Sequence, residues 1–109
     1  MSRAKGDIAE DRAVEFLQER GFVVLERNFY SRFGEIDIVA KKGDTLHFVE
    51  VKSGLDYESA VVNITPTKVK KLVKTLYVYM KKNSLDVDFV LDGVIVTPKN
   101  IELLENITL

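Results

Sequence analysis

The sequence lacks the residues on which several common kinds of site depend. It contains no cysteine and only one histidine, His47, in 109 residues. Disulfide bonds and thiolate metal sites are therefore excluded, and so is a histidine-rich zinc site within one chain. The remaining composition, 46% hydrophobic and 30% charged, is typical of a globular protein. At this length we expect residues 1–109 to form a single domain around one core.

Long hydrophobic runs are also absent. No apolar stretch approaches the roughly 18 residues that a membrane span requires. The first eleven residues, MSRAKGDIAED, carry acids and no hydrophobic segment, which is unlike a signal peptide. We therefore expect a cytoplasmic protein that has no membrane partner.

Charge is unevenly distributed along the chain, although the net charge is only −1. Residues 65–83 contain six lysines and no acid, whereas residues 84–109 contain five acids and one lysine. The low net charge argues against strong nonspecific binding of nucleic acid. A basic segment on an otherwise acidic protein nevertheless suits a polyanionic partner. A solubilising helix face is the alternative explanation.

The segment GEIDIVAKKGDTLHFVEVK, residues 34–52, predicts a β-hairpin with strands at 35–41 and 46–52. Gly43-Asp44 between them suits a two-residue turn of type II′, which has glycine first. Such a turn pairs Lys42 with Thr45 and fixes the register of both strands. Gly34, directly before the hairpin, allows a positive φ or the close approach of a ligand.

This register places Asp37 opposite Glu50 on one face of the hairpin, with Cα atoms roughly 4.5–5.5 Å apart. Lys52 points to the same face, because side chains alternate along a strand. His47 falls on the other face, opposite Ala40, and we expect its role to be structural.

Two carboxylates directly opposite each other repel, and a divalent cation is the natural compensator. Without the cation, at least one of Asp37 and Glu50 should have a raised pKa. Lys52 beside them can orient a metal-bound water or help to deprotonate it. The three residues therefore have the parts for metal-assisted hydrolysis of a phosphodiester. A solvated face with an ordinary Glu–Lys pair is the alternative.

Helical periodicity predicts helices at 2–20 and 65–82. In the first, Glu10 lies at the edge of the apolar stripe and faces the sheet, so it should meet a cation, a metal or a hydrogen-bond donor. A Glu10 that reaches water at the margin of the stripe is the alternative. Gly21 is the expected stop. Thr65-Pro66 provides an N-cap and a proline at N1 for the second helix. Lys68, in its first turn, is the lysine closest to any site that the preceding loop covers.

The rest of the chain predicts strands at 22–30, 87–96 and 101–105 and a loop at 53–64. Three residues are candidate contacts for a nucleic acid: Asn28, near the end of the first of these strands, and two residues of the loop, Ser53 and Tyr57, whose ring can stack on a base. A turn-forming Asn28 and an inert loop are the alternatives. The order αβββαβ, with a short final strand, indicates the α/β class: a mixed sheet with a helix on each face.

These motifs resemble those of the YraN family, small bacterial proteins related to Holliday-junction resolvases and restriction-endonuclease-like nucleases. The matching segments are Gly6-Asp-Ile-Ala-Glu10 with Ala13, Arg27-Asn28, Gly34-Glu-Ile-Asp37-Ile, Phe48-Val-Glu50-Val-Lys52, and Lys68. The resemblance implies the αβββαβ core of the PD-(D/E)XK nucleases and a metal-dependent endonuclease that acts on DNA, including branched DNA. It leaves a homodimer open, because related resolvases dimerise to cut two strands.

The resemblance also implies roles for individual residues. Asp37 and Glu50 would bind Mg²⁺ or Mn²⁺, with the Val51 carbonyl as a further ligand. Lys52 would be the catalytic lysine, and Glu10 an accessory acid near the metal.

Two arginines of the family pattern are missing from this chain. Ser53-Gly54-Leu55 follows Lys52, and Val90-Leu91 precedes Asp92. A catalytically silent nucleic-acid-binding module, with Lys68 and Lys71 on the DNA, and a protein-interaction domain are therefore the competing interpretations.

Overall fold

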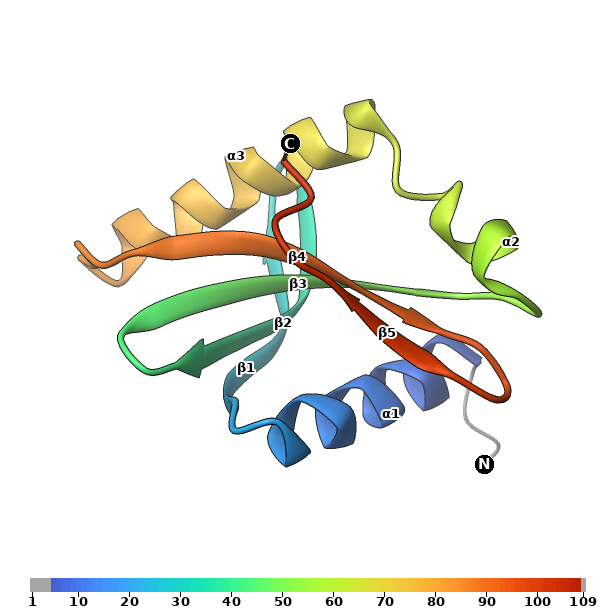
Figure 1. Ribbon diagram of the computed structural model, residues 1–109. Helices are drawn as coiled ribbons and strands as arrows, with labels where there is room; N and C mark the ends of the chain where they lie inside the picture. The colour runs from blue at the N-terminus through green and yellow to red at the C-terminus, as the bar shows by residue number, and fades with distance from the viewer. Residues whose placement is uncertain (1–4, 109) are drawn as a thin grey trace.

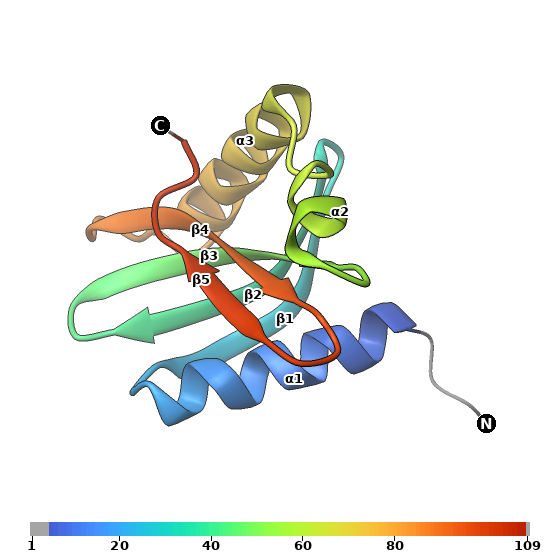
Figure 2. The same ribbon diagram turned by 45° about the vertical axis from the view of Figure 1, so that its right-hand side comes forward.

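The computed structural model describes residues 5–108 and contains one five-stranded sheet in the order β1-β2-β3-β4-β5. β3 and β4 run parallel, and the other neighbours are antiparallel. Helix α1 covers one face of the sheet, while α2 and α3 lie on the other (Figures 1 and 2). The elements are α1 (Lys5–Glu19), β1 (Val23–Ser31), β2 (Gly34–Lys42), β3 (Thr45–Ser53), α2 (Tyr57–Val61), α3 (Pro66–Lys82), β4 (Phe89–Val96) and β5 (Ile101–Leu104). The mixed α/β sheet with helices on both faces is thus confirmed, and its order is consistent with a restriction-endonuclease-like core.

One sequence-based expectation about secondary structure is wrong. The segment 53–64 is not entirely loop, because it contains α2. Asp56 caps this helix: its side chain accepts a hydrogen bond from the Ser59 amide, and the Ser59 hydroxyl completes a capping box. Ala60, within this helix, is fully buried. A helix of five residues is too short to show a helical period, which is why the sequence pattern did not reveal it. Residues 2–4 of the predicted first helix lie outside the described part of the chain.

Helix α1 ends where the glycine signal predicts. Gly21 has a φ of 86°, and its amide donates to the Gln18 carbonyl at 3.1 Å. The Phe22 amide donates to the Leu17 carbonyl at 3.0 Å, which completes a Schellman motif. This stop turns the chain directly into β1.

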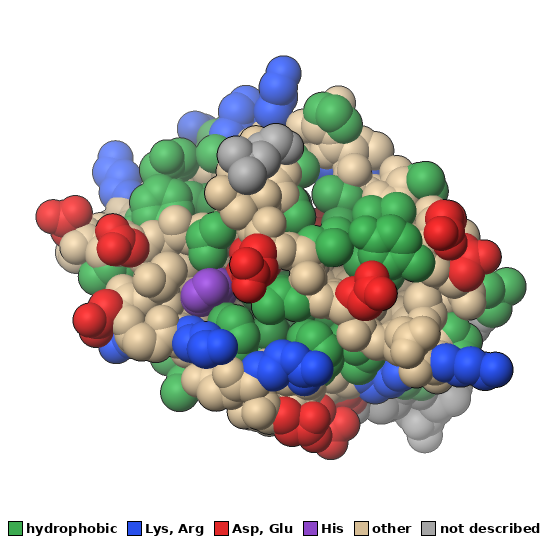
Figure 3. All heavy atoms as spheres, viewed as in Figure 1, with side chains coloured by type: hydrophobic (Ala, Val, Ile, Leu, Met, Phe, Trp, Pro, Cys, Tyr) green, Lys and Arg blue, Asp and Glu red, His purple; other side chains and the backbone are tan. Residues whose placement is uncertain are grey.

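Helix α3 begins as expected at Pro66, with the Thr65 side chain accepting a hydrogen bond from the Lys68 amide at 3.2 Å. Most of its lysines point away from the sheet. In space-filling view, basic side chains accordingly gather along the edge that α3 forms (Figure 3). This cap fixes where the first-turn lysine lies relative to the strands below it.

The sheet separates two hydrophobic cores, one beneath α1 and one beneath α3. Ile38 is fully buried in the α1 core, yet Ile36, two residues earlier on the same strand, is fully buried in the α3 core. Regular alternation would place both on one face. β2 therefore twists sharply at Asp37, and Asn28, in the strand beside it, adopts a left-handed φ of 56°. This twist opens the sheet where the candidate site lies.

The buried Asp92 on β4, unexpected within a strand, is paired with the single histidine. Its Oδ2 lies 2.6 Å from His47 Nδ1, and its Oδ1 accepts a hydrogen bond from the Asn106 amide at 2.8 Å. Phe22 packs edge-on against the imidazole. His47 pairs with Ala40 as predicted, and its contacts fit the structural role expected for it.

Within residues 5–108, none of the helices combines the length and apolar character that a membrane crossing requires.

Candidate functional site

The candidate site lies where β2 and β3 part. Their pairing runs from Lys42 opposite Thr45 to Ile38 opposite Val49, which confirms the predicted register. Gly43 in the turn has a φ of 61°, as the first position of a type II′ turn requires. β3 continues alongside β4 as far as Ser53. The two strands of the hairpin therefore diverge one residue pair before Asp37 and Glu50.

Asp37 occupies this divergence. Its Oδ2 accepts a hydrogen bond from the Val51 amide at 2.7 Å, so a carboxylate oxygen takes the place of a carbonyl from the neighbouring strand. Glu50, only 9% exposed, lies on the other side of the gap and is hydrogen-bonded to Asp37. The two carboxyl groups thus meet as the hairpin register predicts, although the backbone ladder has already ended.

This arrangement raises the pKa of Asp37 from 3.8 to about 8. Burial is the main cause, because it disfavours the charged form. The hydrogen bond to Glu50 and the charge on Glu50 raise this pKa further, while the Val51 amide and Lys52 lower it. The expectation that one of the two facing carboxyls has a raised pKa is confirmed. At neutral pH the pair holds a proton that a cation would have to displace.

Two shallow hollows meet at these carboxyls. We call them the α3-side hollow and the α1-side hollow, and both are lined by Glu35, Asp37, Glu50 and Lys52. The α3-side hollow is completed by Phe33, Gly34, Lys68, Lys71 and Leu72. The α1-side hollow is completed by Gly6, Asp7, Glu10, Asn28, Tyr30 and Val51.

The α3-side hollow combines acids with cations. Lys52 Nζ lies 4.0 Å from Glu50 Oε2, and three-quarters of the Lys52 side chain is shielded from solvent. Lys68 and Lys71 reach the same hollow from α3. The structure therefore brings these two predicted DNA-contacting lysines to the carboxylates. An anionic group placed here would meet cations on two sides.

The α1-side hollow holds Glu10, which is 6% exposed. Its Oε1 accepts hydrogen bonds from Arg27 Nε at 2.8 Å and Asn28 Nδ2 at 3.1 Å. The guanidinium also contacts Asp11 Oδ1 at 2.7 Å. The prediction that Glu10 meets a cation or donor is thus confirmed. Asn28 also lies at the site, because its side-chain amide donates a hydrogen bond to Glu10. Its role is therefore not limited to forming a turn.

Glu35 is a carboxyl that the sequence analysis missed. Burial raises its pKa, and the nearby charge of Asp37 and a hydrogen bond to Asp37 raise it further. A hydrogen bond to Tyr30 lowers it. Glu35 stands two residues before Asp37 on β2, so the strand period was the available signal.

The donor set suits a hard cation. Mg²⁺ is typically held by one or two carboxylates together with waters and substrate phosphate oxygens. Asp37 and Glu50 supply the carboxylates, and Val51 lines the same space. Among residues 5–108 no cluster of three or more acidic, histidine or cysteine side chains is arranged around a metal position. The residues therefore fit a weakly coordinated magnesium ion better than a closed site such as structural zinc.

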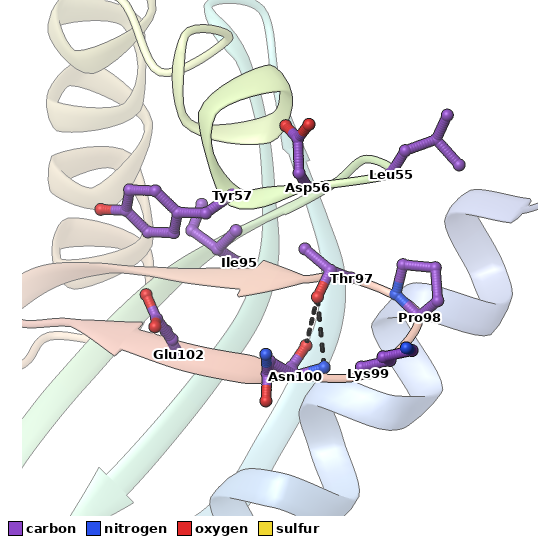
Figure 4. A pocket seen from close by; sticks show the side chains of 9 residues that line it. All are labelled: Leu55, Asp56, Tyr57, Ile95, Thr97, Pro98, Lys99, Asn100 and Glu102. Carbon is purple, nitrogen blue, oxygen red and sulfur yellow. Dashed lines mark hydrogen bonds between the residues drawn. The ribbon is translucent and has the colours of Figure 1, made fainter.

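Two predicted nucleic-acid contacts lie elsewhere. Ser53 lines a groove with Arg12 and Leu55 beside the N-terminal end of α1. Tyr57 lines a separate hollow (Figure 4), next to the turn in which Thr97 and Asn100 are hydrogen-bonded to each other. The structure does not bring Ser53 or Tyr57 to the carboxylates.

Comparison with known proteins gives a consistent family match. The profile of the family described as "Uncharacterised protein family UPF0102" matches residues 9–96. A UPF0102 protein of Sulfurimonas denitrificans is 64% identical over 109 residues, covering both chains fully. One from Aliarcobacter butzleri is 47% identical over 110 residues, again covering both chains. One from Helicobacter pylori is 51% identical over 106 residues, covering 97% of this chain and 92% of the relative.

Proposed function

The chain belongs to the uncharacterised family UPF0102, the YraN family that its motifs indicate, and we propose that it is a metal-dependent nuclease that hydrolyses DNA phosphodiesters. The observation that carries this proposal is the meeting of Asp37, Glu50 and Lys52 where β2 and β3 part. Burying these carboxyls is costly for the fold, as the raised pKa of Asp37 indicates. A divalent cation that displaced the proton would compensate for this cost, because metal-bound carboxylates are deprotonated.

In this proposal Asp37 and Glu50 hold Mg²⁺ or Mn²⁺, and the Val51 carbonyl adds a neutral oxygen. When bound, the cation supplies Lewis-acid polarisation of a phosphoryl oxygen and a lowered pKa for water. Lys52 Nζ, which lies 4.0 Å from Glu50 Oε2, would donate to the attacking water or to a phosphate oxygen. Glu10 is the accessory acid, and Arg27 and Asn28 hold it in position.

Binding of the DNA backbone falls to lysines. Lys68 and Lys71 line the α3-side hollow opposite the carboxylates. We therefore expect Lys68→Ala and Lys71→Ala each to weaken binding to duplex DNA and to reduce the salt slope, d log K/d log[salt], by about 0.9. Lys99→Ala, on the turn after β4, is the control that leaves the slope unchanged.

A catalytically silent DNA-binding module is the second candidate. It is favoured by Ser53, which follows Lys52 where the family pattern has an arginine close by, and which faces away from the carboxylates into another groove. Such a module would bind DNA in a salt-sensitive manner and cleave none.

The deciding experiment measures cleavage of labelled linear, flap and four-way DNA with Mg²⁺ or Mn²⁺. The wild type should cut at least one substrate, and Asp37→Asn and Glu50→Gln should not. Asp44→Asn is the matched control, because it makes the same chemical change in the exposed turn of the same hairpin. Salt-sensitive binding without cleavage by any metal would support the silent module instead.

Calorimetric titration with Mn²⁺ tests the metal site separately. We expect binding by the wild type and none by Glu50→Gln. Absence of binding to the wild type, both alone and with a short duplex present, would contradict the nuclease proposal.

A further inference from the structure

The turn between β1 and β2 carries an aromatic ring to the rim of the α3-side hollow. Phe33, in this turn, lines the hollow together with Asp37 and Lys68. The ring is only half-buried. A hydrophobic ring among charged groups gains less from burial than one in the core, so its position calls for another explanation.

The turn is fastened to α3. The Ser31 hydroxyl lies 3.0 Å from the Thr75 hydroxyl, which itself donates to the Lys71 carbonyl at 2.9 Å. The Phe33 amide donates to Ser31 Oγ at 3.0 Å. Gly34, which lies next to the Lys71 and Thr75 side chains, has a φ of 151°, a backbone conformation that residues with a side chain rarely adopt. Phe33 is therefore held at a fixed place relative to the lysines of α3.

Two cations lie next to the Phe33 ring. The Arg32 guanidinium carbon lies 4.8 Å and Lys74 Nζ 5.6 Å from its centroid. Tyr30, on the other side of the carboxylates, is 69% exposed and lines the α1-side hollow together with acids. The charges of Glu35, Glu10 and Asp37 raise its pKa. Of the two aromatic rings that line these hollows within residues 5–108, Phe33 is the one with the surroundings that a polyanion favours.

We propose that Phe33 is a stacking platform for an unpaired base of the nucleic acid, with Arg32, Lys71 and Lys74 on the flanking phosphates. This assignment rests on the proposed function and narrows its substrate to DNA with a single-stranded or unpaired segment beside the cleaved bond. Aromatic rings next to a basic groove bind single strands because every base offers a π-face. A continuous duplex keeps its base faces stacked and offers none to Phe33.

The absence of tryptophan from the chain provides a direct test. Phe33→Trp gives the protein a single indole whose fluorescence a stacked base should quench. Tyr30→Trp is the matched control, from the same hairpin and the same site. The titrant is a short single-stranded oligonucleotide, and EDTA is present so that no metal-dependent cleavage occurs. We expect quenching of Phe33→Trp and little or none of Tyr30→Trp. Equal quenching of both variants, or none in Phe33→Trp, would overturn the proposal.

Affinity measurements separate stacking from a merely structural role of the ring. Phe33→Leu should weaken single-strand binding by about 5- to 100-fold and leave duplex binding and the salt slope unchanged. Lys74→Ala should instead reduce the slope. Equal losses for single strands and duplex in a folded Phe33→Leu protein would show that the ring only supports the turn.

These results are independent of catalysis. Quenching in EDTA without any metal-dependent cleavage would refute the proposed nuclease activity but support the single-strand binding site at Phe33. Cleavage by a Phe33→Leu protein that binds single strands as well as the wild type does would refute the stacking site alone.

Discussion

Asp37→Asn should stabilise the metal-free protein, although it removes a residue on which the site depends. The pKa of Asp37 is about 8 in the fold, against an ordinary value of 3.8. Between these two values the native protein holds a proton that the unfolded chain has lost. The free energy of unfolding of the wild type therefore falls as pH rises, by about 1.36 kcal/mol for each pH unit. At pH 7 this amounts to at most about 4 kcal/mol.

Asparagine avoids this cost because it carries no ionisable proton. Its side-chain oxygen can still accept from the Val51 amide, and its amide hydrogens can donate to Glu50. We expect the variant to be more stable than the wild type at pH 7, with a Tm higher by roughly 5 °C or more. Towards pH 4 the difference should shrink to roughly 0.5 kcal/mol, because the pH then approaches the ordinary pKa of 3.8, below which Asp37 is protonated in the folded and unfolded states alike.

Thermal unfolding followed by circular dichroism in EDTA, from pH 4 to pH 8, measures both effects. Asp44→Asn should stay within about 0.5 kcal/mol of the wild type. Saturating Mg²⁺ should raise the Tm of the wild type but not that of Asp37→Asn. An Asp37→Asn protein that is less stable than the wild type at pH 7, or a stability difference that does not depend on pH, would show that Asp37 does not hold a proton in the folded protein at neutral pH.

Three further predictions concern the same hairpin. Mg²⁺ affinity should rise between pH 6 and pH 8, by up to about tenfold per unit, because binding displaces the proton that Asp37 holds; calorimetry in two buffers of different ionisation enthalpy would reveal the released proton, and equal heats in both would count against it. Lys52→Gln should slow single-turnover cleavage by about 100-fold or more while Mn²⁺ binding persists, whereas loss of metal binding would mean that the lysine only supports the carboxylates. His47→Ala should lower the free energy of unfolding by about 2 kcal/mol, since it removes a hydrogen bond to the buried Asp92; denaturant titration measures this loss, and a change in cleavage at full folding would contradict a purely structural role.

Local signals in the sequence were sufficient for most of the hairpin. A two-residue turn at Gly43-Asp44 fixes which residues pair, and strand alternation then places Glu50 and Lys52 on one face. The end of α1 at Gly21 and the start of α3 at Thr65 follow equally from capping chemistry. These features depend on residues within a few positions of one another, so a pattern in the chain can reveal them.

The opening of the sheet depends on distant partners. β3 pairs with β4, which lies more than forty residues later in the chain, while β2 pairs with β1. The β3–β4 pairing is not encoded near Asp37, and the left-handed Asn28 gives no signal beyond its residue type. The position of Phe33 likewise depends on Ser31 and Thr75 meeting across the fold.

The twist of β2 at Asp37 also bears on cooperativity. Ile36 completes the core beneath α3, and Ile38 completes the core beneath α1. Neither half of the molecule can close its core without this strand, so the two halves should fold and unfold together rather than one after the other. Asp37, one of the two carboxyl residues of the site, lies between Ile36 and Ile38. The backbone amides of the site, that of Val51 above all, should therefore exchange hydrogen with solvent only through global unfolding. The site should then persist for as long as the fold itself does.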